Sequence, residues 1–319
     1  MPAAPAIQTD GIRPRFSGHE SFPLRFGWLA KGVRFCRQRP SGFSADADAM
    51  VDLGVGKNMV RSIRFWALEA GMIEAGPAGR SSRTPSLQPT SLGELLFEED
   101  GEDPYMEDPA TTWLVHWQLA SRPHGPTTWY WLFNLLRSPE FTKDDVLREI
   151  RQLQVRNGWA ALSDETLARD LDCCLRCYLP SDSDRKLSGE DSLDCPLAEL
   201  DLLRRGSEPD RYTLARATRP GLSTRVFGYA LLEYCRHGLP SNTRAVAFDQ
   251  IAYAPGSPGQ VFRLSENALA DKLMSLERDT RGAITFGSTA GLRQVYLREL
   301  PDHPSELLRT SKRRRHAHA

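Results

Sequence analysis

The sequence predicts a mainly α-helical protein with small β-hairpins, which places it in the α+β class. Apolar residues recur every three or four positions through most of the chain, as expected for amphipathic helices. Residues 21–90 follow the order helix, helix, glycine turn, helix and flexible wing, and residues 262–296 follow the order strand, helix and hairpin. This order is typical of winged helix-turn-helix-like modules, and we expect two of them.

The first module begins with a helical pattern over 21–37, in which Phe26, Leu29, Val33 and Cys36 share one face. The segment DADAMVDLGVGKNMVRSIRFWALEAGMI then predicts a short helix, a turn at its glycines and a longer helix. The following GPAGRSSRTPSLQPT is rich in glycine, proline, serine and arginine, so it predicts a flexible wing or hairpin.

Two aromatic helices are predicted next, at TTWLVHWQLAS and TTWYWLFNLL. Residues 142–157 form a further predicted helix, with Thr142 as its N-cap and Asn157 at its end. Ser163 is the expected N-cap of the helix after that.

The second module has its own N-cap and turn signals. Ser265 precedes its predicted helix, and Gly291 lies near the turn of its predicted hairpin. We place a domain boundary near residue 140, which gives an N-terminal domain, 1–140, and a C-terminal domain, 141–319, that contains the second module and a basic tail.

The composition limits the class of protein. The 319 residues are 40% hydrophobic and 26% charged, as in an ordinary globular protein, and no apolar run is long enough to span a bilayer. The first residues lack the apolar core of a secretion signal, so we expect a cytoplasmic protein without membrane association. The six cysteines are then expected to be reduced. The pair Cys174 and Cys177 lacks the second close pair that a zinc knuckle needs.

Charge is segregated along a chain whose formal net charge is +0. Residues 1–40 carry seven lysines and arginines against two acids, whereas residues 91–110 carry eight acids and no base. A zero total gives no general attraction to DNA. The separation nevertheless suits a protein that holds a phosphate backbone at one place and a metal ion at another.

The longer helix of the first module divides its residues between two faces. Apolar residues occupy one face, while Lys57, Arg61 and Arg64 fall at i, i+4 and i+7 on another, beside Asn58. These residue types bind phosphates and base edges, so we predict that the four residues contact double-stranded DNA, together with Arg25 of the basic N-terminal segment. The alternative is a solvated amphipathic helix with ordinary surface bases.

The segment FSGHESF places His19 beside Glu20. A histidine serves as a general base or a metal ligand near neutral pH, and a glutamate binds a hard cation or orients the histidine. The alternative is that both residues cap a helix that begins near Ser21.

In the segment EEDGEDPYMEDP, Asp100, Asp103, Glu107 and Asp108 lie within nine positions. Cleavage of a phosphodiester by metal ions needs carboxylates that hold one or two cations against the phosphate. The alternative is a solvated acidic loop at the start of the next helix, with Asp108 before Pro109.

Together the two segments predict a cutting site. We expect Mg²⁺ or Mn²⁺ to be held by Glu20, Asp100, Asp103 and Asp108, and we expect His19, Glu20 and Asp103 to be the catalytic residues. Motifs for ATP hydrolysis, dinucleotide binding and zinc proteolysis are absent from the sequence.

Other aromatic and histidine residues are interpreted as core. His116 lies between Trp113 and Trp117, which is more typical of a histidine at the core edge than of a ligand. The aromatic run over 129–133 either stacks on unpaired bases or, more often for such helices, belongs to the core.

Three long blocks resemble a known family. They are FSGHESFPLRFGWLAKG, LGVGKNMVRSIRFWA and PTSLGELLFEEDGEDPYMEDPATTWLVHWQLAS, extended by TTWYWLFN and EDSLDCPLAELDLL. They resemble a bacterial domain-of-unknown-function family that includes the SspB-type nickases of DNA phosphorothioation, found in phage-defence clusters. The positions inside matched blocks are His19, Glu20, Arg25, Lys57, Asn58, Arg61, Arg64, Asp100, Asp103, Glu107 and Asp108.

The resemblance implies a protein that nicks DNA so that partners replace a phosphate oxygen with sulfur. The implied partners are a cysteine desulfurase, a PAPS-reductase-like sulfur-transfer protein and an ATPase. Three hypotheses follow: a metal-dependent nicking endonuclease, a non-catalytic DNA-binding adaptor that recruits the sulfur-transfer enzyme, and a regulator of transcription. The regulator requires a homodimer that binds two half-sites.

Overall fold

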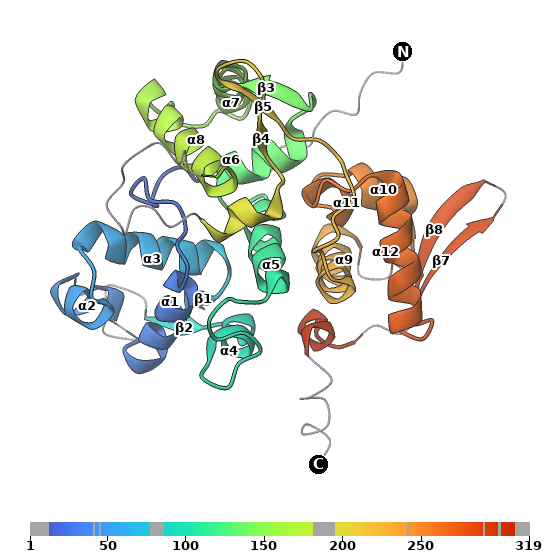
Figure 1. Ribbon diagram of the computed structural model, residues 1–319, viewed down its shortest axis with the longest axis horizontal. Coiled ribbons are helices and arrows are strands. Elements are labelled where there is room, and N and C mark those ends of the chain that lie inside the picture. The colour runs from blue at the N-terminus through green and yellow to red at the C-terminus, as the bar shows by residue number, and fades with distance from the viewer. Residues whose placement is uncertain are drawn as a thin grey trace.

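The computed structural model describes the main part of the chain, namely residues 13–40, 42–44, 46–76, 86–180, 195–240, 243–289, 291–298 and 301–309. Figure 1 shows an N-terminal group of helices around α3, a group around α7 and α8, and a C-terminal group around α9 and α12, with α5 between them. Helices and small antiparallel sheets together confirm the predicted α+β class.

The N-terminal module, defined as residues 28–89, has the predicted order of elements. It contains α1 (Trp28–Gln38), a 3-10 turn (Gly42–Ser44), α2 (Asp46–Leu53), α3 (Lys57–Glu69), β1 (Ile73–Ala75) and β2 (Leu87–Pro89). The two strands pair antiparallel, and α1 packs on α3 and β2. Most of the predicted wing, 77–85, lies outside the described residues.

The first helix begins later than predicted. Gly27 is its N-cap with φ of 76°, a left-handed conformation that glycine adopts without strain, and the helix starts only at Trp28. Phe26 therefore precedes the helix and is 41% exposed instead of sharing its apolar face. The interpretation of His19 and Glu20 as caps of a helix beginning near Ser21 is also wrong.

The central part of the chain supplies the frame. It contains α4 (Ser91–Phe97), α5 (Pro109–Ala120), α6 (Thr127–Tyr130) with one π-helical turn (Trp131–Leu135), β3 (Glu140–Thr142), α7 (Lys143–Arg156), α8 (Asp164–Tyr178), a 3-10 helix (Pro196–Leu200), β4 (Arg204–Arg205) and β5 (Arg211–Thr213). The sheet order is β3-β5-β4. Thr142 and Ser163 are the N-caps of α7 and α8, as predicted, and Thr142 forms a capping box with Asp145.

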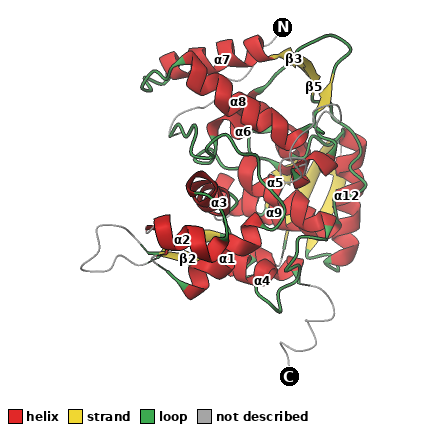
Figure 2. Ribbon diagram, turned by 60° about the vertical axis from the view of Figure 1, so that its left-hand side comes forward, coloured by secondary structure: helices red, strands yellow, loops and turns green. Residues whose placement is uncertain are grey.

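The C-terminal module, defined as residues 224–297, ends in a hairpin beside a long helix. It contains α9 (Thr224–Gly238), β6 (Ala245–Ala247), α10 (Phe248–Tyr253), α11 (Pro258–Val261), α12 (Glu266–Asp279), β7 (Ile284–Thr289) and β8 (Leu292–Leu297), followed by a 3-10 helix (Pro304–Leu308). Its sheet order is β6-β8-β7, and Ser265 caps α12 as predicted. Figure 2 shows α12 at the opposite side of the molecule from α2.

The core is continuous through α5. All ten residues from Thr111 to Ala120 are buried, so this helix is covered on every side and lies between the other elements. The aromatic run 129–133 and His116 are buried too, which confirms that they belong to the core. The six cysteines are buried and unbridged. No helix in the described ranges is both long and apolar enough to cross a membrane.

Candidate nucleic-acid interface

The predicted division of α3 into two faces is confirmed. Its apolar residues Val60, Ile63, Trp66 and Ala67 are buried against the module. The polar residues Lys57, Asn58, Arg61 and Arg64 are all exposed. This face therefore offers three cations and one amide along a single helix, and contact with DNA remains a prediction.

Arg25 lies on the segment that leads into α1. Its guanidinium lies over the rings of Phe22 and Trp28, at 5.6 and 5.5 Å from the ring centroids. Such cation–π contacts hold an arginine at a fixed position without neutralising its charge.

The loop of residues 17–22 has an unusual backbone. Ser17, Gly18, Glu20 and Ser21 all have positive φ, between 49° and 96°. A Cβ at Gly18 would also lie 2.8 Å from the ring of Phe65, so only glycine fits there. Non-glycine residues in this region cost about 1–3 kcal/mol each and persist only where surrounding contacts impose them.

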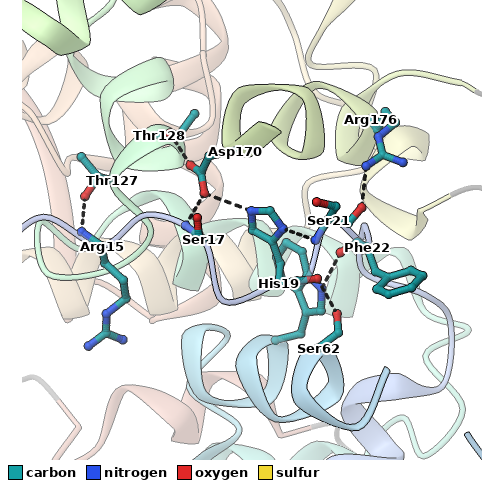
Figure 3. Close-up of polar contacts among 11 residues, drawn as sticks. Arg15, Ser17, His19, Ser21, Phe22, Ser62, Thr127, Thr128, Asp170 and Arg176 are labelled. Atoms are coloured by element: carbon teal, nitrogen blue, oxygen red, sulfur yellow. Dashed lines mark hydrogen bonds and ion pairs between the residues drawn. The ribbon is translucent and has the colours of Figure 1, made fainter. Parts of the chain in front are cut away.

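His19 supplies those contacts from inside the protein, as Figure 3 shows. Its side chain is 2% exposed and lies against the rings of Phe65, Trp66 and Trp129. Its Nδ1 accepts a hydrogen bond of 3.0 Å from the backbone N–H of Ser21, and its Nε2 lies 3.0 Å from Asp170 Oδ1. Because Nδ1 accepts, the neutral ring carries its proton on Nε2 and donates it to Asp170.

Asp170 of α8 joins three segments of the chain. Its Oδ1 also accepts a hydrogen bond of 2.6 Å from the N–H of Ser17, and its Oδ2 accepts one of 2.6 Å from the hydroxyl of Thr128 on α6. On the other side, the hydroxyl of Ser62 on α3 donates to the carbonyl of His19. The loop thus fastens α3 to α6 and α8.

His19 and Glu20 point in different directions. Both ring nitrogens of His19 are engaged within the protein, whereas Glu20 is exposed and its Oε1 lies 3.8 Å from Arg61 Nη1. The side chain of Glu20 therefore borders the basic face of α3, while His19 has the contacts of a structural residue.

The acidic segment forms the turn before α5. Asp103 is buried and accepts hydrogen bonds from the backbone N–H groups of Glu107, at 2.8 Å, and Asp108, at 3.1 Å. Asp108 is the N-cap of α5 and accepts from the N–H of Ala110 at 2.8 Å, which confirms the capping interpretation. Asp100 is exposed on the same loop.

The structure does not bring the predicted metal ligands together. Figure 1 shows the 17–22 segment on the side of α3 that faces α8, and the loop between α4 and α5 at the opposite side of α3. Within the described ranges, no group of three or more histidine, cysteine, aspartate or glutamate side chains is placed to hold a metal ion. Glu20, Asp100, Asp103 and Asp108 therefore do not form a common site for Mg²⁺ or Mn²⁺ here.

Asp170 and Glu69 were not predicted from the sequence. Glu69, at the end of α3, is buried, pairs with Arg15, and has a pKa raised by burial. The sequence nevertheless contains a signal for Asp170. On the amphipathic helix α8, Asp170 falls on the same face as the apolar residues Leu167, Leu171 and Cys174. A charged residue on a buried face needs internal partners.

Comparison with known proteins found a matching family model and similar solved structures. A family model described as "Protein of unknown function (DUF4007)" matches residues 16–311. Two solved structures are similar, magnesium ion-bound SspB with a TM-score of 0.84 and SspB with a TM-score of 0.83. Each is 30% identical in sequence, and each match covers 94% of this chain and 88% of the other. No curated protein matches the chain.

Proposed function

Because this chain belongs to the DUF4007 family and is an SspB-type protein, as its sequence blocks predict, we propose that it binds double-stranded DNA and nicks one strand in a DNA phosphorothioation system. The observation that carries the proposal is the exposed basic face of α3, formed by Lys57, Asn58, Arg61 and Arg64. Bases along one helical face neutralise successive phosphates, and asparagine and arginine recognise base edges.

In this proposal the N-terminal module acts as a winged helix-turn-helix, with α3 as the recognition helix in the major groove. α3 has 13 residues and so spans roughly 20 Å, enough to follow the groove. Gly56 precedes it without a side-chain cap, which leaves its first N–H groups available to a phosphate. The 17–22 loop holds α3 against the frame.

The partners follow from the resemblance. A nick exposes a strand end that other proteins modify, so the proposed partners are a cysteine desulfurase, a PAPS-reductase-like sulfur-transfer protein and an ATPase. Magnesium in a structure of SspB supports including Mg²⁺ in the assay.

The test is conversion of supercoiled plasmid to open circles by the purified protein, with Mg²⁺ or Mn²⁺ and with EDTA. We expect open circles without linear product, because one strand is cut. A protein prepared with Arg61→Glu and Arg64→Glu serves as the binding-deficient comparison, and it should leave the plasmid supercoiled.

A second candidate is the non-catalytic adaptor. It is favoured by one observation, the lack of a metal-holding group among the described residues. Plasmid that shifts on a gel but stays supercoiled under every metal condition would support the adaptor and contradict nicking. Plasmid that neither shifts nor relaxes would contradict both candidates.

A further inference from the structure

A cavity of about 610 Å³ lies where the C-terminal ends of α3, α5 and α9 approach one another. This volume is in the range that holds a nucleotide-sized ligand, roughly 300–1,000 Å³. The arginines, acids and histidines around it are Arg15, Glu69, Arg122, His124, Glu233 and His237. Its lining includes residues of the helix that carries the proposed DNA-binding face and residues of the C-terminal module.

Two arginines are held in fixed positions in this cavity. Arg122 donates from Nε to the carbonyl of Gln118, at 3.0 Å, and from Nη2 to the carbonyl of Glu69, at 2.9 Å. Burial lowers the pKa of its guanidinium from the usual value, although the carboxylates nearby raise it. Arg15 pairs with the Glu69 carboxylate and is 54% exposed, so its guanidinium lies between a buried acid and solvent.

The two carboxylates of the cavity already have donors. Glu69 is paired with Arg15. Glu233 of α9 accepts hydrogen bonds of 3.1 Å from the indole of Trp117 and from the side-chain amide of Gln118. Both acids are therefore engaged by the protein, and their charge is partly compensated before a ligand enters.

His124 and His237 complete the lining and are both exposed. Of the five histidines that the structure describes, His19 and His116 are buried, and His303 caps the last 3-10 helix away from the cavity. The cavity thus combines two accessible histidines with two arginines. Histidine is the side chain most used for proton transfer near neutral pH, and arginine stabilises charge on a phosphate.

We propose that this cavity is the cutting site, with His124 and His237 as the proton-transfer pair and Arg15 as the phosphate-binding group, an inference that rests on the proposed nicking function. One histidine takes a proton from water as its oxygen bonds to phosphorus. The other gives a proton to the sugar oxygen as the phosphorus–oxygen bond breaks. One water is consumed, and the products are a phosphate monoester and a free hydroxyl.

The test compares nicking and duplex binding in His124→Ala, His237→Ala and, as a matched control, His303→Ala. Loss of one proton-transfer group lowers such rates about 100-fold or more. We expect this loss for His124→Ala and His237→Ala, with duplex affinity and melting temperature unchanged because both side chains are exposed. Added imidazole should restore part of the nicking, while His303→Ala should nick at the wild-type rate.

Each of the following outcomes would contradict the assignment of the cavity as the cutting site. Wild-type rates in both cavity variants would remove the histidines from the reaction and leave the nicking function standing. Loss of nicking together with a lower melting temperature and no imidazole rescue would assign them a structural role. A wild-type protein that binds duplex DNA without nicking it would contradict the proposed nicking and this site together.

Discussion

The N-terminal and C-terminal modules differ in the charge that their long helices expose, although each places a long helix before an antiparallel hairpin. α3 carries three bases on its exposed face, and its one acid, Glu69, is buried. α12 carries four acids and two bases. The two long helices thus carry net charge of opposite sign although the element orders are similar, and of the two helices only α3 is suited to a phosphate backbone.

Charged side chains of α12 form hydrogen bonds with other elements of the C-terminal module. Glu266 accepts hydrogen bonds from Tyr253, at 2.5 Å, and from Arg293 of β8, at 2.9 Å. Arg293 also lies 3.4 Å from Asp249 of α10, and Glu277 of α12 accepts a hydrogen bond of 3.2 Å from the backbone N–H of Phe286 on β7. These contacts fasten the hairpin and the helix to their own module. The comparison leads us to expect that the exposed charge of the long helix, and not the order of elements, decides whether such a module binds nucleic acid.

Each module is also tied to the frame by a buried histidine. His19 joins the N-terminal module to Asp170 of α8. His116 of α5 lies 3.0 Å from the carbonyl of Val261 on α11 and 2.8 Å from the hydroxyl of Tyr178 on α8. Both ring nitrogens of each histidine have hydrogen-bond partners. We therefore expect that removing the partners of either histidine lowers the free energy of unfolding.

The largest effect is expected from Asp170→Ala. The change leaves the N–H of Ser17, the hydroxyl of Thr128 and the Nε2–H of His19 without their buried acceptor. Removing one partner of such a buried arrangement lowers the free energy of unfolding by about 3–5 kcal/mol. Urea unfolding followed by circular dichroism measures the change.

Asp172→Ala is the matched control for that experiment. Asp172 lies on the same helix but is half exposed and pairs with Lys143 at 2.7 Å. An exposed pair of this kind contributes at most about 1 kcal/mol. If both variants unfold at the same urea concentration, the hydrogen bonds of Asp170 do not stabilise the attachment of the N-terminal module to α6 and α8.

The second-largest expected effect is on the pH dependence of stability. It concerns His116, which connects α5 to the C-terminal module. Burial lowers the pKa of His116 from 6.5 to about 3. Between these two values the unfolded chain binds a proton that the folded chain does not, so this residue destabilises the fold as pH falls below 6.5. Between pH 6.5 and 5 the loss is about 2 kcal/mol.

His116→Gln should remove this part of the pH dependence, because glutamine does not titrate. The measurement is the difference in unfolding free energy between pH 7 and pH 5 for both proteins, with the exposed His303→Gln as control. Equal pH dependence in wild type and His116→Gln would show that His116 does not titrate differently on unfolding.

The smallest effect is expected from Glu20→Gln. Glu20 Oε1 lies 3.8 Å from Arg61 Nη1, so removing its charge removes a carboxylate that competes with phosphate for Arg61 and should raise duplex affinity about two- to fourfold at low salt. Fluorescence anisotropy measures the affinity, and the same protein is tested for nicking. Loss of nicking without a change in affinity would instead restore Glu20 to the catalytic role that the sequence predicts.

Local signals in the sequence predicted much of the fold. The caps Thr142, Ser163 and Ser265 lie where their short polar side chains precede apolar periodicity, because capping depends on neighbouring residues only. The two faces of α3 followed from its period for the same reason. The start of α1 was missed because Gly27 adopts a left-handed conformation in place of an ordinary cap.

The candidate site was harder to predict because its contacts are distant in sequence. His19 meets Asp170 across 151 positions, and Glu69 meets Arg15 across 54. Adjacent residues such as His19 and Glu20 suggested a joint role, but the positive φ of Glu20 turns the two side chains apart. Periodicity and spacing describe one segment at a time and do not report which segments meet.

The most direct test of the difference between the modules is duplex affinity as a function of salt for two matched double charge reversals. One combines Arg61→Glu with Arg64→Glu on α3, and the other combines Arg278→Glu with Arg281→Glu at the end of α12; all four residues are exposed. We predict that the α3 variant loses about tenfold or more in affinity and flattens the salt slope by about 0.9 per lost phosphate contact. The α12 variant should bind like wild type. Equal loss in both variants, or none in the α3 variant, would contradict the assignment of the DNA-binding surface to α3.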